Sequence, residues 1–305
     1  MTGDGSPEAT AATSRSQTRV DAVQRAYDGS STVYRLLALS GWGPALLNLG
    51  YYGPVPLLGG IAAAQRRLVR KAVGLLGVNA DDRILDVACG RGESSSILKQ
   101  MHPASTVTGV DLLDENIAFA LAHFSAPSGL SFQTGDAMSL AAPDGSFDRV
   151  ICIEAAFHFP DRARFLRESF RVLRPGGRLV VVDFTWTTPA ARQERDDPRT
   201  QLVRRIWQWD DFSAASEYAH DAAAAGFVSR SAADWSARVT RQLQRRFALA
   251  VTMGSARLGR GVLRVAYPRY REFSPADWHD LALAVEAHAH VQRHSRYMAF
   301  VFDKV

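Results

Sequence analysis

The chain has 305 residues, 47% of them hydrophobic, which is enough for one large α/β domain with additions or for two small domains. Its net charge of +5 comes from arginines scattered among many alanines and aspartates, so we interpret the blocks "QRRLVRK" and "RQLQRR" as solvated helix faces and expect no nucleic-acid partner. The two cysteines lie in apolar contexts and do not suggest a disulfide framework. No apolar run is long enough to span a membrane, and no signal-peptide core is evident. We therefore expect a cytoplasmic protein.

The N-terminal part divides into a tail and a helical segment. Residues 1–18 are rich in Ser, Thr, Gly and Ala and cannot offset their ordering entropy, which predicts a disordered tail. Residues 19–75 read as helices interrupted by "SGWGP" and "GYYGPVP", where Gly and Pro force turns. Tyr51 and Tyr52 fall in the second of these turns.

A regular alternation of strands and helices begins near residue 84. The expected strands are 83–88, 106–111, 130–133, 148–153 and 178–184, and the expected helices are 92–101, 114–123 and 161–173. This order predicts an α/β fold with a doubly wound parallel sheet. Ligands of such sheets bind beyond the carboxyl ends of the strands, which places the functional site before any motif is named.

The remainder of the chain is helical and aromatic before it returns to strands. A strand is expected near 227–237, long helices at about 240–256 and 275–292, and a last strand in "SRYMAFVFDKV".

The stretch "ILDVACGRGESS" joins the first expected strand to a glycine-rich turn. A dinucleotide fingerprint requires a third glycine that is missing here, and Asp86 and Glu93 would repel a diphosphate. The same acids suit S-adenosylmethionine, which carries an ammonium and a sulfonium but no phosphate. Gly90 and Gly92 would let the backbone approach this ligand without a Cβ in the way.

Two further acids follow at the ends of the next strands. Asp86 is placed to reach the ammonium, directly or through water, and Asp111 is placed to accept both ribose hydroxyls. Asp136 would then meet the adenine amino group, with Ala137 and Met138 beside the ring.

Five motifs together resemble those of class I S-adenosylmethionine-dependent methyltransferases. They are "LDVACGRG", "VTGVDL", "GDAMSL", "GSFDRVICIEAAFHF" and "RVLRPGGRLVVVDF", in the order and spacing of that family. The resemblance implies a Rossmann-like seven-stranded sheet in the order 3-2-1-4-5-7-6 with strand seven antiparallel. It also implies a methyltransferase domain over 76–305, with helical cap insertions at about 186–225 and 238–292, behind a helical lid at 19–75. One mild departure is Ala88-Cys89, where the family more often has Gly-Cys.

The closest likeness is to small-molecule enzymes of the sterol, tocopherol, phthiotriol and polyketide type, through "IEAAFHFPD" and "LLNLGYYGP". The cofactor-binding residues that this resemblance implies are Asp86, Ala88, Cys89, Gly90, Gly92, Asp111, Leu112, Asn116, Gly135, Asp136, Ala137, Glu154, Ala155 and Tyr51. The substrate-contacting residues that it implies are Tyr52, Phe157, His158, Trp186 and Trp207.

Methyl transfer needs an oriented nucleophile and, for a hydroxyl acceptor, a general base. His158 is the leading candidate because it follows strand four and its ring titrates near neutral pH, although it could also simply shape the pocket. Glu154 could be a base or could line the cofactor pocket, and Asp183 could contact substrate or cap the next segment.

His290 and His294 lie four residues apart on an expected helix, which is a possible metal pair. No third ligand of clear spacing accompanies them, so we expect an exposed polar helix face and no metal.

These observations predict a methyltransferase for an apolar small molecule, most simply a specialised metabolite, with O-methylation ahead of C-methylation. The alternatives are a lipid or quinone methyltransferase and a methyltransferase-like cyclase that binds the cofactor without methyl transfer. "EAAFHFP" after strand four argues against base amino methylation, which would want an Asn/Asp-Pro-Pro-aromatic run there. The long aromatic N-terminal helices suggest a homo-oligomer formed through them.

Overall fold

The computed structural model describes residues 45–53, 60–125, 127–266 and 268–305, so the expected tail and most of the expected lid lie outside the described residues. Its centre is a seven-stranded sheet in the order β3-β2-β1-β4-β5-β7-β6, in which β7 is antiparallel to both of its neighbours. The strands are β1 (Arg83–Val87), β2 (Thr106–Asp111), β3 (Leu130–Thr134), β4 (Phe147–Ile153), β5 (Leu173–Trp186), β6 (Val228–Asp234) and β7 (Ser295–Asp303). The predicted α/β sheet and its strand order are confirmed.

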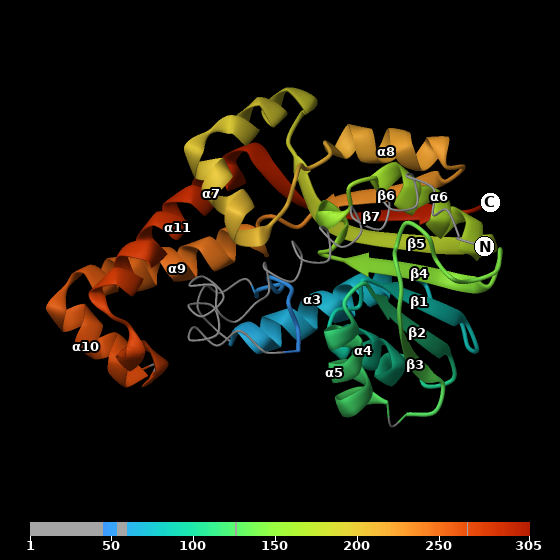
Figure 1. Ribbon diagram of the computed structural model, residues 1–305, viewed down its shortest axis with the longest axis horizontal. Helices are drawn as coiled ribbons and strands as arrows, with labels where there is room; N and C mark the ends of the chain where they lie inside the picture. Colours follow the sequence, from blue (N-terminus) through green and yellow to red (C-terminus); the bar gives the residue numbers. More distant parts are fainter. Residues whose placement is uncertain (1–44, 54–59, 126, 267) are drawn as a thin grey trace, which may run out of the picture.

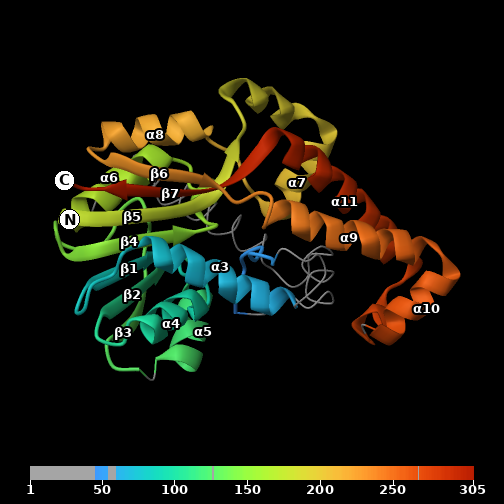
Figure 2. The same cartoon turned by 180° about the vertical axis from the view of Figure 1, so that it is seen from behind.

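Helices cover both faces of the sheet (Figures 1 and 2). One face is covered by α3 (Ile61–Leu75), α4 (Glu93–Met101) and α5 (Asp114–Phe124), and the other by α6 (Arg162–Val172) and α8 (Ala215–Ala224). The strand side chains alternate accordingly: Ile84 packs in the first of these cores and Leu85 in the second. Burial on both sides explains why the central strands are continuous apolar runs.

The chain changes direction across the sheet between β1 and β4. β1 pairs in parallel with β2 on one side and with β4 on the other. The crossovers that follow these two neighbouring strands therefore run in opposite directions, which opens a crevice at their carboxyl ends.

A helical cap extends beyond this end of the sheet (Figures 1 and 2). It contains α7 (Pro198–Trp207), α9 (Thr240–Ser255), α10 (Arg257–Ala266) and α11 (Pro275–His294), with α7 and α9 both packed on α11. Three 3-10 turns, η1 (Ala156–His158), η2 (Pro189–Asp196) and η3 (Pro268–Glu272), complete the connections. Trp186, Trp209 and Phe212 form the aromatic core where the cap meets the sheet.

Two predicted boundaries need correction. α3 falls within the expected lid, yet Leu68, Val69 and Val73 pack it against the sheet. α8 falls within the first expected cap insertion, yet Tyr218 and Ala222 pack it against the other sheet face. In both cases the apolar face of the helix is buried against strands, and this burial holds the helix on the sheet. Within the described ranges, no helix is both long enough and apolar enough to cross a membrane.

Candidate functional site

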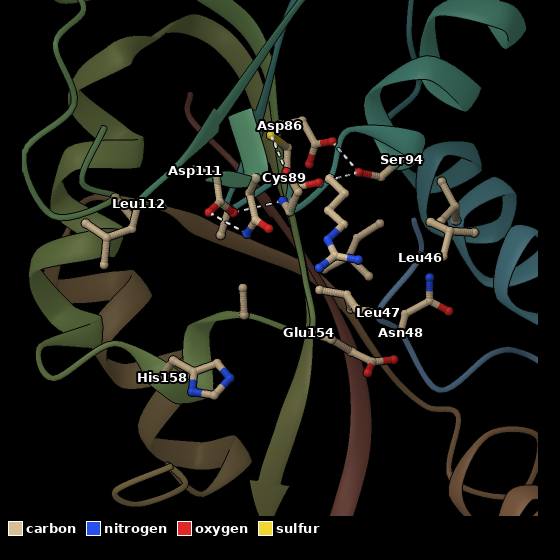
Figure 3. Close-up of a pocket in the computed structure, with 18 of the residues that line it drawn as sticks. Leu46, Leu47, Asn48, Asp86, Cys89, Ser94, Asp111, Leu112, Glu154 and His158 are labelled. Atoms are coloured by element: carbon tan, nitrogen blue, oxygen red, sulfur yellow. Dashed lines mark hydrogen bonds between the residues drawn. The ribbon is translucent and has the colours of Figure 1, made fainter. Parts of the chain in front are cut away.

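Two cavities open at the carboxyl ends of the strands. The first, here called the polar cavity, has about 980 Å³ of empty space including its open mouth. Its walls come from the β1–α4 turn, the ends of β2 and β3, the turn after β4, and residues 45–48. Figure 3 shows Asp86 and Asp111 at one end of this cavity and Glu154 and His158 at the other. The predicted cofactor residues that line it are Asp86, Ala88, Cys89, Gly90, Asp111, Leu112, Asn116, Gly135, Ala137, Glu154 and Ala155.

The glycine-rich turn takes three left-handed backbone conformations, at Ala88 (φ 56°), Gly90 (φ 55°) and Gly92 (φ 86°). Gly90 lines the polar cavity, and among the described residues a Cβ there would have one neighbour within 4 Å, Leu47 Cδ1 at 3.8 Å. Gly92 does not line the cavity; a Cβ there would lie 2.6 Å from Ala120 Cβ. The expectation that Gly92 admits the ligand is therefore wrong. It lets α5 pack closely against the turn.

Asp86 and Asp111 are buried carboxyls held by short hydrogen bonds. Asp86 Oδ2 accepts from Ser94 Oγ and Ser95 Oγ, both at 2.7 Å, and burial raises the pKa of Asp86 to about 6. Asp111 Oδ2 accepts from Gly90 N at 2.8 Å, which ties the end of β2 to the glycine turn. Burial also raises the pKa of Asp111. Both groups disfavour a ligand anion and gain from a nearby cation or hydroxyl donor.

Two predicted cofactor residues lie elsewhere. Asp136 does not line the polar cavity; its Oδ1 accepts from Met138 N at 2.9 Å and shapes the turn after β3. Tyr51 lines neither cavity and packs edge-on against Trp235, with ring centroids 5.4 Å apart. In each case the backbone directs the side chain away from the cavity and toward neighbouring residues.

Glu154 is the central polar residue of the site. It has a left-handed backbone (φ 51°) directly after β4, and its carboxyl accepts the Tyr297 hydroxyl and the amide of Leu49, the latter at 2.9 and 3.1 Å. Burial raises the pKa of Glu154 to about 8, although the Tyr297 and Leu49 donors oppose that shift. Within the described part of the chain, Glu154 and Leu47 are the residues that line both cavities.

The second cavity, here called the apolar cavity, has about 1050 Å³ of empty space between the sheet edge and the cap. Phe157 and Trp207 line it as predicted, but Tyr52 and Trp186 do not. Trp186 is fully buried and donates its indole N–H to Asp211 Oδ1 at 2.8 Å, and Tyr52 packs with Ala64 and Leu243. The aromatic lining is Phe157, Phe184, Trp207, Trp209, Phe212 and Phe247.

His158 lines the polar cavity and not the apolar one. Burial lowers its pKa to about 4, so the expected titration near neutral pH is not found. Asp183 lines neither cavity; it is fully buried and accepts from Tyr218 Oη at 2.6 Å, which disfavours substrate contact, one of the two roles considered for it.

Helices α9 and α11 lie within the cap insertion expected at about 238–292, but none of their residues is predicted from the sequence to line a cavity. Leu243 and Phe247 come from α9, and Leu281, Ala284 and Val291 from α11. Their spacing of three, four and seven residues indicates an apolar helix face, but it does not indicate which part of the protein this face contacts. His288 also lines this cavity, where Trp207 Nε1 donates to its Nε2 at 2.8 Å and its Nδ1 lies 2.7 Å from Ala284 O.

The expectation of an exposed polar face at His290 and His294 is wrong. His290 is only 4% exposed, and Glu194 from η2 lies beside the pair as a third residue of ligating type. Glu194 is far from His290 and His294 in the sequence, so local spacing does not indicate that the three residues meet.

Comparison with known proteins shows similarity to methyltransferases. Residues 85–181 match the family described as "Methyltransferase domain". The chain is 32% identical over 210 residues to the 2-methyl-6-phytyl-1,4-hydroquinone methyltransferase of Synechocystis sp., covering 64% of this chain and 63% of that protein. It is 36% identical over 143 residues to the 27-O-demethylrifamycin SV methyltransferase of Amycolatopsis mediterranei, covering 46% and 52%. The chain thus spans about half to two thirds of these relatives.

Solved structures share the whole architecture at low identity. The [4+2]-cyclase SpnF aligns with a TM-score of 0.67 and 22% identity, covering 93% of this chain and 96% of that one. A geranyl diphosphate methyltransferase, in complex with geranyl diphosphate and sinefungin, aligns with a TM-score of 0.69 and 16% identity, covering 94% and 98%. At these identities the likeness supports the fold, cap included.

Proposed function

Because the chain belongs to the class I S-adenosylmethionine-dependent methyltransferases, we propose that it transfers the methyl group of S-adenosylmethionine to an apolar small molecule. One observation carries this proposal: a cavity lined by acids and a cavity lined by aromatic rings meet at Glu154 and Leu47. A methyl donor in the first cavity and an acceptor in the second would react at that junction.

The residues of the polar cavity fit the cofactor. Asp111 caps the end of β2, where a ribose would offer two hydroxyls to its carboxylate. Asp86 lies at the same end of the cavity and would favour the ammonium group. Gly135 and Ala137 leave room for a flat ring at the end of β3. When bound, the cofactor would supply a carbon activated by its sulfonium, and the protein positions the acceptor and excludes water.

The apolar cavity supports the proposed class of acceptor. Its lining is aromatic and aliphatic with few polar groups, which favours a large apolar molecule over a small polar one. The relatives include methyltransferases of a phytyl hydroquinone and of a rifamycin, which are molecules of that kind. A specialised metabolite or a quinone-type lipid fits both observations.

We assign the role of general base, which removes the proton from the acceptor molecule, to Glu154 rather than to His158. Glu154 lines both cavities, whereas His158 lines only the polar one. A carboxyl with a pKa of about 8 is a stronger base than an ordinary one once it has lost its own proton, so it would suit removal of a hydroxyl proton, and O-methylation, near and above pH 8. C-methylation is the alternative that the aromatic lining favours, because ring faces stabilise a carbocation.

Calorimetric titration with S-adenosylmethionine, S-adenosylhomocysteine and NADH tests the cofactor assignment. Binding of the first two and not of NADH is expected, and binding of NADH alone would refute the proposal. Extracts of apolar metabolites incubated with methyl-labelled S-adenosylmethionine then test transfer. A labelled product supports methylation, whereas a rearranged unlabelled product would mean that the chain is a cyclase that retains the cofactor.

A further inference from the structure

A cluster of two histidines and a glutamate lies on the cap, outside both cavities. His290 Nε2 is 3.2 Å from Glu194 Oε2, and His294 Nε2 is 3.9 Å from the same oxygen. One ligating atom of each of the three residues lies within 4.8 Å of the other two. We propose that Glu194, His290 and His294 bind one divalent transition-metal ion, such as Zn²⁺, which fastens η2 to the end of α11.

The burial of His290 supports a ligand rather than a solvated helix face. Its side chain is 5% exposed, and its Nε2 atom is buried without a hydrogen bond of good geometry, although it faces Glu194. A buried polar atom that lacks such a bond is costly unless another group completes it. A metal ion between Nε2 and the carboxylate would complete it.

The spacing of the three groups is close to that of a metal site. Ligand atoms of a tetrahedral zinc site, with bonds of ~2.0–2.1 Å, lie roughly 3.3 Å apart. The His290–Glu194 separation of 3.2 Å is close to this value, whereas the side chain of His294, 32% exposed on the last residue of α11, would have to rotate inward from its present 3.9 Å. Asp197 Oδ1, 3.7 Å from His290 Nε2, or a water would supply the fourth ligand.

The donor set selects the kind of metal. Two imidazoles with one carboxylate suit Zn²⁺, Co²⁺ or Ni²⁺, whereas Mg²⁺ prefers oxygen ligands alone. One contact opposes binding: Arg293 Nη2 lies 3.2 Å from His290 Nδ1, which places the histidine proton on Nε2. Arg293 is exposed, so a change of its rotamer lets Nδ1 carry the proton and frees Nε2 for the metal.

The site has a structural role in the cap and stands apart from the reacting groups. Another face of α11 lines the apolar cavity through Ala284, His288 and Val291. η2 leads directly into α7, which supplies Val203 and Trp207 to the facing wall. A metal that joins η2 to α11 therefore fixes two walls of the apolar cavity to each other without touching its contents.

Zinc titration of the untagged, metal-free full chain by calorimetry tests the site. We expect one Zn²⁺ per chain, with affinity weakened at least tenfold in Glu194→Gln and His294→Ala, which leave the buried His290 in place. The matched control is His279→Ala, an exposed histidine of the same helix, which should bind Zn²⁺ like the parent chain. Equal zinc affinity in all four proteins, or no binding to the parent chain, would overturn the proposal.

Hydrogen exchange gives a second readout that does not depend on methyl transfer. At a Zn²⁺ concentration that saturates the parent chain but lies below the dissociation constant of Glu194→Gln, Zn²⁺ should slow amide exchange at 189–197 and at the end of α11 in the parent chain and in His279→Ala. It should have little effect in Glu194→Gln. Slower exchange in Glu194→Gln as well would place the bound zinc elsewhere and refute this site.

Discussion

The backbone amide of Leu49 donates to both carboxyl oxygens of Glu154, at 2.9 and 3.1 Å, across 105 residues of sequence. This contact joins the segment before α3 to the turn after β4. Tyr297 of β7 donates to the same carboxyl from another side. Glu154 therefore fixes one wall of the polar cavity while it also lines the apolar cavity, so that one side chain sets the geometry of both.

The ionisation of Glu154 should make the chain less stable as the pH rises. Its folded pKa of about 8 exceeds the ordinary value of 4.5, so between about pH 5.5 and 7.5 the folded state holds a proton that the unfolded state has lost. This one group should remove roughly 2–3 kcal/mol of unfolding free energy across that range, at about 1.4 kcal/mol per pH unit. Urea unfolding of the ligand-free chain at several pH values measures the slope.

Glu154→Gln is the matched variant, because its amide oxygen still accepts from Leu49 and Tyr297 but does not ionise. Its unfolding free energy should fall less steeply over the same pH range. Parallel pH profiles for the two proteins would show that the carboxyl titrates at an ordinary pKa.

The sheet was predictable because its signals are local. Apolar runs bounded by turns give the strands, and helices between them require parallel crossovers. The position of the site at the carboxyl ends of the strands follows from the same rule, and Asp86, Gly90 and Asp111 do line the cavity there.

The errors share a physical cause, which is that side-chain direction depends on tertiary packing. Tyr51, Asp136 and Trp186 have chemistry suited to a site, yet each is turned toward local partners. Conversely, the distant α11 enters the site because it packs on α7 and α9, which no local pattern specifies.

Asp111→Ala should weaken S-adenosylmethionine binding at least tenfold, because a charge-assisted hydrogen bond contributes ~1.5–3 kcal/mol. The matched control is Asp136→Ala, since Asp136 also follows a strand of the sheet but does not line the polar cavity. Calorimetry should therefore separate the two variants. An equal loss of S-adenosylmethionine affinity in both variants would mean that Asp136 does contact the cofactor.

Ala284→Phe should fill part of the apolar cavity, because Ala284 is a buried lining residue of α11. Binding of an apolar fluorescent dye such as anilinonaphthalene sulfonate should fall several-fold, while the affinity for S-adenosylhomocysteine stays unchanged. The control is Leu283→Phe, at the neighbouring position, whose side chain is 45% exposed. Unchanged dye binding in Ala284→Phe would mean that apolar ligands bind elsewhere.

His158 should remain neutral until the pH falls to about 4, because burial disfavours the imidazolium. Nuclear magnetic resonance of the chain labelled at histidine measures this directly, with His158→Gln used to assign the signal. A His158 midpoint near 6.5 would restore it as a candidate base.

Ala88→Gly should stabilise the chain. Ala88 has φ 56°, a left-handed conformation that costs an L-residue with a Cβ roughly 1–2 kcal/mol. Glycine removes this strain but adds entropy to the unfolded chain, so the expected net gain is about 0.5–1 kcal/mol in unfolding free energy. The same substitution at Ala219, an exposed position within α8, should instead destabilise by about 1 kcal/mol. Urea unfolding of both variants measures the difference, and a loss of stability in both would mean that the turn holds Ala88 without strain.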